Sequence, residues 1–163
     1  MITVSEASQE DIPEIINLYM QEHWFKEGYD TNFITNKPDT CHILVAKEDG
    51  KVIGTAQVDI IHTLAFGNQP YAAIEFVVVN KEHRRKGVAS KIFEQIDKIC
   101  LENDCESAML TSTIYRTEAH LFYEEMGYVA AVRGFRKEFP EKIITKREAN
   151  KRIYKMLADK QIQ

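Results

Sequence analysis

The chain has 163 residues, of which 44% are hydrophobic and 28% are charged, as expected for one soluble globular domain. Its net charge of −4 argues against general nucleic-acid binding, and its apolar runs fall short of the ~20 residues of a membrane span. The three cysteines fit neither a disulfide framework nor a zinc site, and the first residues, MITVSEAS, do not resemble a signal peptide. We therefore expect a cytoplasmic protein with reduced thiols and no bound metal.

The first forty residues predict a strand, a helix and a shorter second helix among loops. Residues 2–5 alternate between apolar and polar side chains, as a half-buried strand does. Ser8 and Asp11 are N-cap candidates for a helix whose apolar residues recur at helical spacing. Residues 23–40 have a mixed composition, from which we expect a short helix and loops. Several aromatic residues are candidates for the wall of an acceptor pocket, with helix-face packing as the alternative: Tyr19, Trp24, Phe25 and Tyr29.

Three consecutive strands are predicted next, at residues 42–47, 52–64 and 71–79. Asp49-Gly50 separates the first two and favours a hairpin turn, because this dipeptide accepts positive φ. Gly54 is a candidate bulge in the second strand. The short connections predict that the three strands form an antiparallel meander.

The segment after the third strand has the features of an anion-binding site. The apolar run 74–79 ends at Asn80, and residues 81–91 then contain five basic residues against one acidic residue. Gly87 opens an amphipathic helix within this segment. Backbone N–H groups at the start of a helix have no partner within it, and the helix dipole adds partial positive charge there. A strand, a basic turn and a helix start in this order predict a site for phosphate groups.

The remaining elements are predicted in the order helix 87–103, strand 107–111, helix 117–126, and a hairpin of 128–132 and 135–139. The strand that follows the long helix is expected to run parallel to the strand before it, or to splay away from it. The tail, 140–163, carries seven basic residues against three acidic ones in a helical pattern. Docking, dimerisation and fraying all remain open for this tail.

Two motifs carry a resemblance to a known family. Arg84-Arg85-Lys86-Gly87-Val88-Ala89 fits R/Q-x-x-G-x-G/A, the acetyl-CoA signature of the GNAT family of N-acetyltransferases. Residues 118–128, EAHLFYEEMGY, resemble the family segment A-x-x-x-Y-x-x-x-G-F/Y. With the element order, the resemblance covers residues 1–139. One departure is Arg116, which stands where the family often has Asn.

The resemblance implies a mixed α/β fold of the GNAT acyl-CoA N-acyltransferase type, with a domain at residues 1–139 and a basic tail at 140–163. It also implies acetyl-CoA as co-substrate. Backbone groups of the strand 71–79 would bind the pantetheine amides. The N–H groups at the start of the helix that follows would bind the pyrophosphate, in a turn that we call the cradle. The alternative is a buried strand followed by a solvated basic turn. The residues expected at this site are Val77, Val79, Arg84, Arg85, Lys86, Gly87, Val88, Ala89 and Ser90.

Tyr123 and Glu75 are the catalytic candidates. The resemblance places Tyr123 as the acid that protonates the leaving thiolate, and a phenol can do so. Packing on an apolar helix face is the alternative role. Glu75 lies within an apolar strand, and simple alternation predicts that it faces the same side as Val77 and Val79. It is expected either to deprotonate the acceptor amine or to pair with a nearby cation.

The expected reaction is direct transfer of an acetyl group from acetyl-CoA to a primary amine of a small cationic molecule. The acidic balance outside the basic turn favours a cationic acceptor. His120, Arg116 and Trp24 are the substrate-contact candidates, with ordinary surface or packing roles as alternatives. A peptide or protein amine as acceptor, and a non-catalytic acyl-CoA-binding module, are the competing functions. No nucleic acid or membrane is expected as a partner, and a homodimer is left open.

Overall fold

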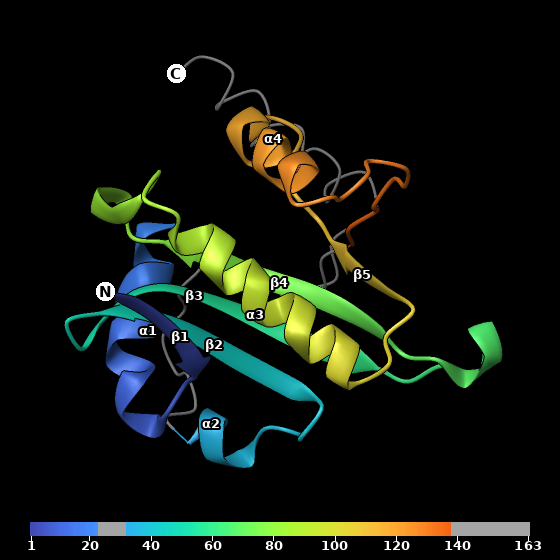
Figure 1. Cartoon of the computed structure of the whole chain (residues 1–163), viewed down its shortest axis with the longest axis horizontal. Helices are drawn as coiled ribbons and strands as arrows, with labels where there is room; N and C mark the ends of the chain where they lie inside the picture. Colours follow the sequence, from blue (N-terminus) through green and yellow to red (C-terminus); the bar gives the residue numbers. More distant parts are fainter. Residues whose placement is uncertain (23–31, 138–163) are drawn as a thin grey trace. The chain divides into compact units, whose positions relative to one another are not determined.

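The computed structural model describes residues 1–22 and 32–137 (Figure 1). The chain divides into two compact units, residues 1–129 and 130–163. Every helix and strand of the described residues lies in the first unit. Within the described ranges, no helix combines the length and hydrophobicity that crossing a membrane requires. The predicted tail at residues 140–163 and the substrate-contact candidate Trp24 lie outside the described residues.

One mixed sheet with the strand order β1-β2-β3-β4-β5 forms the centre of the first unit, which confirms the predicted mixed α/β fold. The first four strands pair antiparallel, and β4 pairs parallel with β5. Asp49 and Gly50 have φ of 51° and 80°, so the predicted hairpin turn joins β2 to β3. The strands are β1 Ile2–Glu6, β2 Cys41–Glu48, β3 Lys51–Ile61, β4 Tyr71–Val79 and β5 Ser107–Leu110.

The described residues also form four α-helices, at the predicted places in the chain: α1 Ile12–Gln21, α2 Phe33–Asn36, α3 Val88–Glu102 and α4 Thr117–Glu125. Short 3-10 turns occur at Gln9–Asp11, Phe66–Asn68 and Lys81–His83. At the first of these turns, the Ser8 N–H and hydroxyl both donate to the Asp11 carboxylate, at 2.8 and 2.9 Å. The same carboxylate pairs with Lys47 at 2.7 Å, so the start of α1 is tied to β2.

The two faces of the sheet are covered by different helices. The apolar face of α3 packs on one side and forms a core cluster with β2, β3 and β4, as its sequence periodicity predicts. Leu18 and Ile15 of α1 pack on the other side against β2 and Val78. Figure 1 shows α3 lying over one face of the sheet, roughly along β3 and β4. The sheet is therefore buried on both sides along β2 and β3.

The start of α3 approaches the sheet most closely at Gly54. A Cβ at this position would lie 3.0 Å from Val88 Cγ1 and 3.1 Å from Ile92 Cδ1. The pairing of β2 with β3 also shifts register here, which confirms the predicted bulge. Gly54 thus allows the helix start to rest directly on β3.

The prediction of a final hairpin is wrong for the described residues 128–137. Residues 128–137 form no strand, and 138–139 lie outside the described residues. Val129, Val132 and Phe135 are 81%, 79% and 91% exposed. Strand preference depends on a packed neighbouring surface, so an alternating pattern alone does not form a strand.

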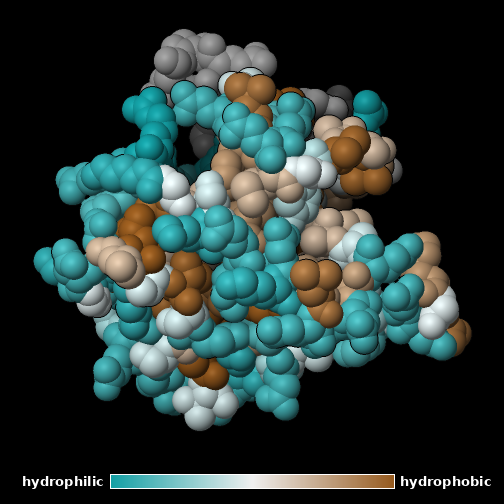
Figure 2. Space-filling model, in the orientation of Figure 1, coloured by the Kyte–Doolittle hydropathy of each residue, from teal (hydrophilic) through white to brown (hydrophobic). Residues whose placement is uncertain are grey.

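On the face seen in Figure 2, hydrophilic residues predominate and hydrophobic ones form only small groups.

Candidate active site

The turn between β4 and α3 has the backbone geometry of an anion cradle. Arg85 and Gly87 have φ of 59° and 77°, and Gly87 is the residue that precedes α3. The Lys91 N–H donates to the Gly87 carbonyl at 3.2 Å, so the N–H groups of residues 88–90 come before the first hydrogen bond of the helix. Because the N-cap residue Gly87 has no side chain, it does not occupy these N–H groups with a capping hydrogen bond. A Cβ at Gly87 would have no atom within 4 Å, so the turn is open above it.

Arg84, Arg85 and Lys86 are exposed beside this turn, while Val88 is buried against the sheet. The three cations raise the local positive potential around the free N–H groups. Val88 fixes the position of the helix start, because its side chain belongs to the core cluster under α3. Ala89 and Ser90 are partly buried and keep the first turn small.

A split in the sheet lies directly before the cradle. β5 pairs with Tyr71–Ile74, so among the described residues the β4–β5 ladder ends at Ile74 and does not continue along Glu75–Val79. The Asn80 N–H donates to Ile53 in β3 at 2.8 Å, so Asn80 directs its backbone groups toward β3. Because alternate residues of a strand direct these groups to opposite edges, Val79 and Val77 direct theirs into the split. The sequence predicted a parallel pair or strands that splay apart, and β4 and β5 run parallel over Tyr71–Ile74 before their pairing ends.

A bulge in β4 changes which side chains share a face. Thr55 pairs with Val78, but Gln57 pairs with Glu75, so Phe76 and Val77 together stand opposite one residue of β3. Phe76 has φ of 51°, in the left-handed region. Ile74 and Val77 consequently both pack with the cluster under α3, although they are three positions apart.

Glu75 therefore lies on the α1 side of the sheet, and the prediction that it shares a face with Val77 and Val79 is wrong. The extra residue in the bulge reverses the alternation between Glu75 and Val77. Glu75 is half-buried beside the end of the β4–β5 pairing. Burial raises the pKa of its carboxyl, and the negative charge of Asp59 on β3 raises it further. A carboxyl group with a raised pKa therefore lies where the β4–β5 pairing ends.

Tyr123 lies on α4 within an aromatic cluster. Its ring centroid is 5.8 Å from that of Phe93, 5.6 Å from Phe122 and 6.3 Å from Tyr128. Burial raises the pKa of the Tyr123 phenol, and the charge of Arg116 opposes part of that rise. The phenol therefore keeps its proton at neutral pH. The packing role considered from the sequence is present, and it leaves an acid role open because packing uses the ring rather than the hydroxyl.

These features agree with a comparison of the sequence with known families. The profile described as "Acetyltransferase (GNAT) family" matches residues 9–128. The chain belongs to the GNAT acetyltransferase family. Enzymes of this family use acetyl-CoA as co-substrate, which is the cofactor expected from the motif at Arg84–Ala89.

Individual relatives carry related names. The chain is 27% identical over 132 residues to N-alpha-acetyltransferase 30 of Xenopus laevis, covering 81% of this chain and 46% of the relative. It is 28% identical over 134 residues to N-alpha-acetyltransferase MAK3 of Arabidopsis thaliana, covering 79% of this chain and 66% of the relative. The chain thus spans between about half and two thirds of the length of these two relatives.

The fold is also similar to solved structures of this family. Glucosamine-6-phosphate N-acetyltransferase from Arabidopsis thaliana superposes with a TM-score of 0.75 at 21% identity, covering 86% of this chain and 99% of that structure. This likeness concerns the fold of the GNAT domain.

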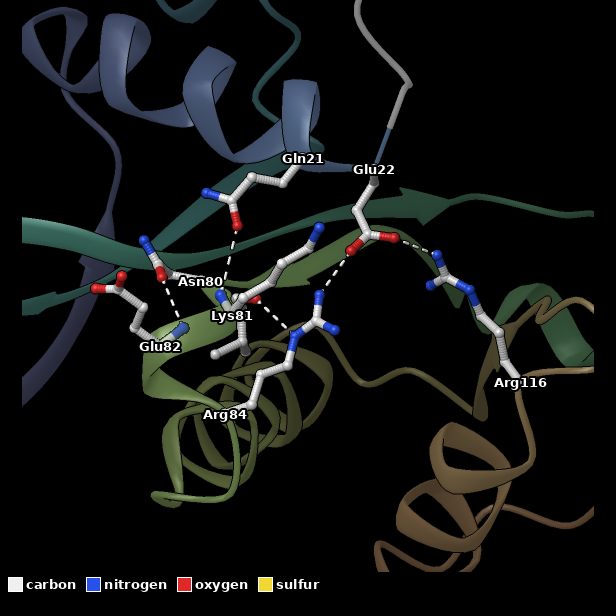
Figure 3. A network of polar contacts seen from close by, with 8 residues as sticks. Gln21, Glu22, Asn80, Lys81, Glu82, Arg84 and Arg116 are labelled. Carbon is white, nitrogen blue, oxygen red and sulfur yellow. Dashed lines mark hydrogen bonds and ion pairs between the residues drawn. The ribbon is translucent and has the colours of Figure 1, made fainter. Parts of the chain in front are cut away.

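Two of the predicted substrate-contact residues, His120 and Arg116, have protein partners. His120 Nε2 lies 3.0 Å from the Thr113 carbonyl, so this nitrogen is a donor within its own segment. Arg116 pairs with Glu22, at the end of α1. Arg84 pairs with the same carboxylate at 2.6 Å, and its Nε donates to the Val79 carbonyl at 3.2 Å. Figure 3 shows the Glu22 carboxylate between the two guanidinium groups.

Two residues near the split were missed by the sequence analysis. The negative charge of Asp59 raises the pKa of Glu75, and Glu22 forms ion pairs with both Arg84 and Arg116. Asp59 could have been suspected, since it lies on the predicted strand next to Glu75. Glu22 gives no local signal, because its two partners are 62 and 94 positions away in the sequence.

The thiols do not provide a nucleophile for a covalent mechanism. Burial raises the pKa of Cys41 to about 12 and that of Cys100 to about 11, and it also raises the pKa of Cys105. All three thiols therefore stay protonated at neutral pH, and the thiolate is the nucleophilic form. Within the described ranges, no group of three or more His, Cys, Asp or Glu residues is placed to hold a metal ion.

Proposed function

We propose that the chain is an N-acetyltransferase that transfers the acetyl group of acetyl-CoA directly to a primary amine. The observation that carries this proposal is the split beside Glu75–Val79, which leads to the open helix start at Gly87. Coenzyme A has an amide-containing arm and a diphosphate, and the described residues offer strand-edge backbone groups and free N–H groups in that order. The residues present therefore fit the cofactor.

Val77 would hold the arm through backbone groups that face the split, and Val79 through its N–H, because the Val79 carbonyl accepts from Arg84 Nε at 3.2 Å. The N–H groups of residues 85–90 would hold the diphosphate, assisted by the charge of Arg85 and Lys86. When bound, acetyl-CoA supplies the activated acetyl group. The protein supplies orientation of the reactants and the two proton transfers.

Glu75 is proposed to accept a proton from the acceptor ammonium, because only the free amine can attack the acyl carbon. Its raised pKa makes the carboxylate a better base than an exposed glutamate. Tyr123 is proposed to donate its phenolic proton to the leaving sulfur. The acceptor nitrogen loses two protons, one to Glu75 before attack and one to solvent once the C–N bond has formed. The leaving sulfur gains one proton from Tyr123, which recovers it from solvent, and Glu75 returns its proton to solvent, so one proton is released in each turnover.

The acceptor is proposed to be a small cationic amine. Asp59 and Glu75 lie on the same face of adjacent strands, where two carboxylates favour a cation. A protein N-terminus is the second candidate acceptor, and the names of the two N-alpha-acetyltransferase relatives support it. Both candidates present a protonated amine to the same base.

The test is a transfer assay that measures release of the coenzyme A thiol. Polyamines, amino sugars, peptides with a free α-amine and α-acetylated peptides with an internal lysine would be compared at equal concentration. Turnover with the small amines supports the first acceptor, and turnover with the free α-amine peptides alone supports the second. Tight acetyl-CoA binding without turnover on any amine would favour the non-catalytic module.

A further inference from the structure

We propose that Glu22 competes with the diphosphate of coenzyme A for Arg84, so that cofactor binding exchanges one partner of this arginine for another. This inference rests on the proposed cofactor site. It concerns a positioning residue, Glu22, that directly follows α1 and lies outside both motifs that carry the family resemblance.

The contacts place Arg84 between the two sites. Its Nη2 donates to Glu22 Oε1 at 2.6 Å, and its Nε donates to the Val79 carbonyl at 3.2 Å. Val79 is the last residue of β4 and faces the split, while Gly87 is three residues beyond Arg84. The guanidinium therefore lies where the split meets the cradle. Figure 3 shows it directed toward α1, at the carboxylate of Glu22.

Glu22 is a strong competitor for a cation at this place. Its side chain is only 15% exposed, so solvent screens its charge less than that of a surface carboxylate. A second guanidinium, that of Arg116, donates to the other carboxylate oxygen. Arg116 remains a partner of Glu22 when Arg84 leaves, so the carboxylate is not left without a cation. A diphosphate at the cradle carries more negative charge than one carboxylate and can draw Arg84 away.

The exchange predicts that one substitution outside the cofactor site makes acetyl-CoA binding tighter rather than weaker. Glu22→Gln keeps the size of the side chain but removes the charge that holds Arg84 at the end of α1. Arg84 then reaches the diphosphate without first leaving an ion pair, so acetyl-CoA should bind about fivefold more tightly at low salt. A purely structural role for Glu22 predicts the opposite, because loosening α1 would weaken binding.

The test measures the Kd for acetyl-CoA by titration calorimetry in a double-mutant cycle of Glu22→Gln and Arg84→Gln. We expect the gain from Glu22→Gln to disappear in the Arg84→Gln background and to shrink as salt is raised. The matched control is Glu14→Gln, which removes one negative charge from α1 itself. The Glu14 carboxylate accepts the Val52 N–H at 2.7 Å, so this variant also loosens a contact between α1 and the sheet. Its Kd should stay near that of the wild type.

Unchanged or weaker binding by Glu22→Gln, or a full gain that persists without Arg84, would overturn the exchange and leave the proposed cofactor site intact. If Glu22→Gln fails to fold, Glu22→Asp keeps the charge on a shorter side chain and should give a smaller gain. A gain absent in that variant as well would overturn the exchange. A wild-type chain that does not bind acetyl-CoA would overturn the proposed function together with it.

Discussion

Glu75 and Val77 are two positions apart in β4, yet their side chains lie on opposite faces of the sheet. The bulge at Phe76 separates them and leaves Val77 under α3 and Glu75 on the α1 side. One strand can therefore serve two reactants. Its backbone faces the split where the cofactor is proposed to lie, and its carboxylate faces the other side, from which the amine is proposed to approach.

The first prediction concerns Glu75 as a base. Glu75→Gln should lower kcat by about 100-fold or more, the usual range for loss of a general base. In the wild type the rate should rise as Glu75 loses its proton, at a pH above the ordinary glutamate pKa of ~4.3. A second variant, Asp59→Asn, removes the negative charge that adds to the effect of burial on the Glu75 pKa. It should therefore move the rise in rate to lower pH. A pH–rate profile that keeps its acidic limb in Glu75→Gln would contradict this role.

The second prediction concerns the stability cost of the same carboxylate. Its pKa is higher in the folded chain than in the unfolded chain, so its contribution to stability is fully present below the unfolded pKa and is lost as pH rises through the folded pKa. At neutral pH, Glu75→Gln should therefore raise the free energy of unfolding. The gain should fade as the pH approaches about 4, where the wild-type carboxyl is protonated. Urea unfolding at several pH values measures the difference, and an equal gain at every pH would show that ionisation is not its cause.

The third prediction separates catalysis from packing at Tyr123. Tyr123→Phe keeps the ring that contacts Phe93 and should lower kcat by at least about tenfold with little change in the Kd for acetyl-CoA. Tyr128→Phe is the matched control, since its ring also contacts Phe93, with a centroid distance of 5.7 Å. Steady-state kinetics on both variants test the role. Equal rates for the two variants would mean that the Tyr123 hydroxyl does no chemistry.

The sequence predicted those features that depend on local pattern. The meander follows from three apolar runs and the Asp49-Gly50 turn, and the buried face of α3 follows from its periodicity. The cradle follows from Gly87 and its basic neighbours. Each of these signals lies within one short segment of the chain.

The features that the sequence did not predict depend on contacts between distant segments. The bulge at Phe76 is fixed by how β4 pairs with β3, and a phenylalanine gives no sign of a positive φ. The Glu22 ion pairs require the folded positions of α1, the cradle and the segment before α4. The predicted strand at 128–132 was wrong because its alternation lacks a packed surface.

The fourth prediction tests the cradle with two glycines in the same backbone state. Gly87 and Gly50 have φ of 77° and 80°, and a Cβ on either would meet no atom within 4 Å. Valine at each position should therefore cost a similar conformational strain, about 1–2 kcal/mol. Only Gly87→Val should also weaken acetyl-CoA binding, because its side chain would stand above the free N–H groups. Titration of both variants with acetyl-CoA provides the comparison, and equal Kd values would show that the diphosphate binds elsewhere.

The fifth prediction concerns the close contact that positions the helix start. Gly54→Ala would place a Cβ 3.0 Å from Val88 Cγ1 and 3.2 Å from the Val78 carbonyl oxygen. Because the backbone oxygen of a central strand cannot retreat easily, α3 must shift, and we expect a loss of about 1–3 kcal/mol in the free energy of unfolding. Adding Val88→Ala removes the Cγ1 atom and should restore part of that loss, although Val88→Ala alone destabilises the core. Thermal unfolding of the two single variants and the double variant measures this coupling. Simple additivity of the two losses would show that the helix start does not rest on Gly54.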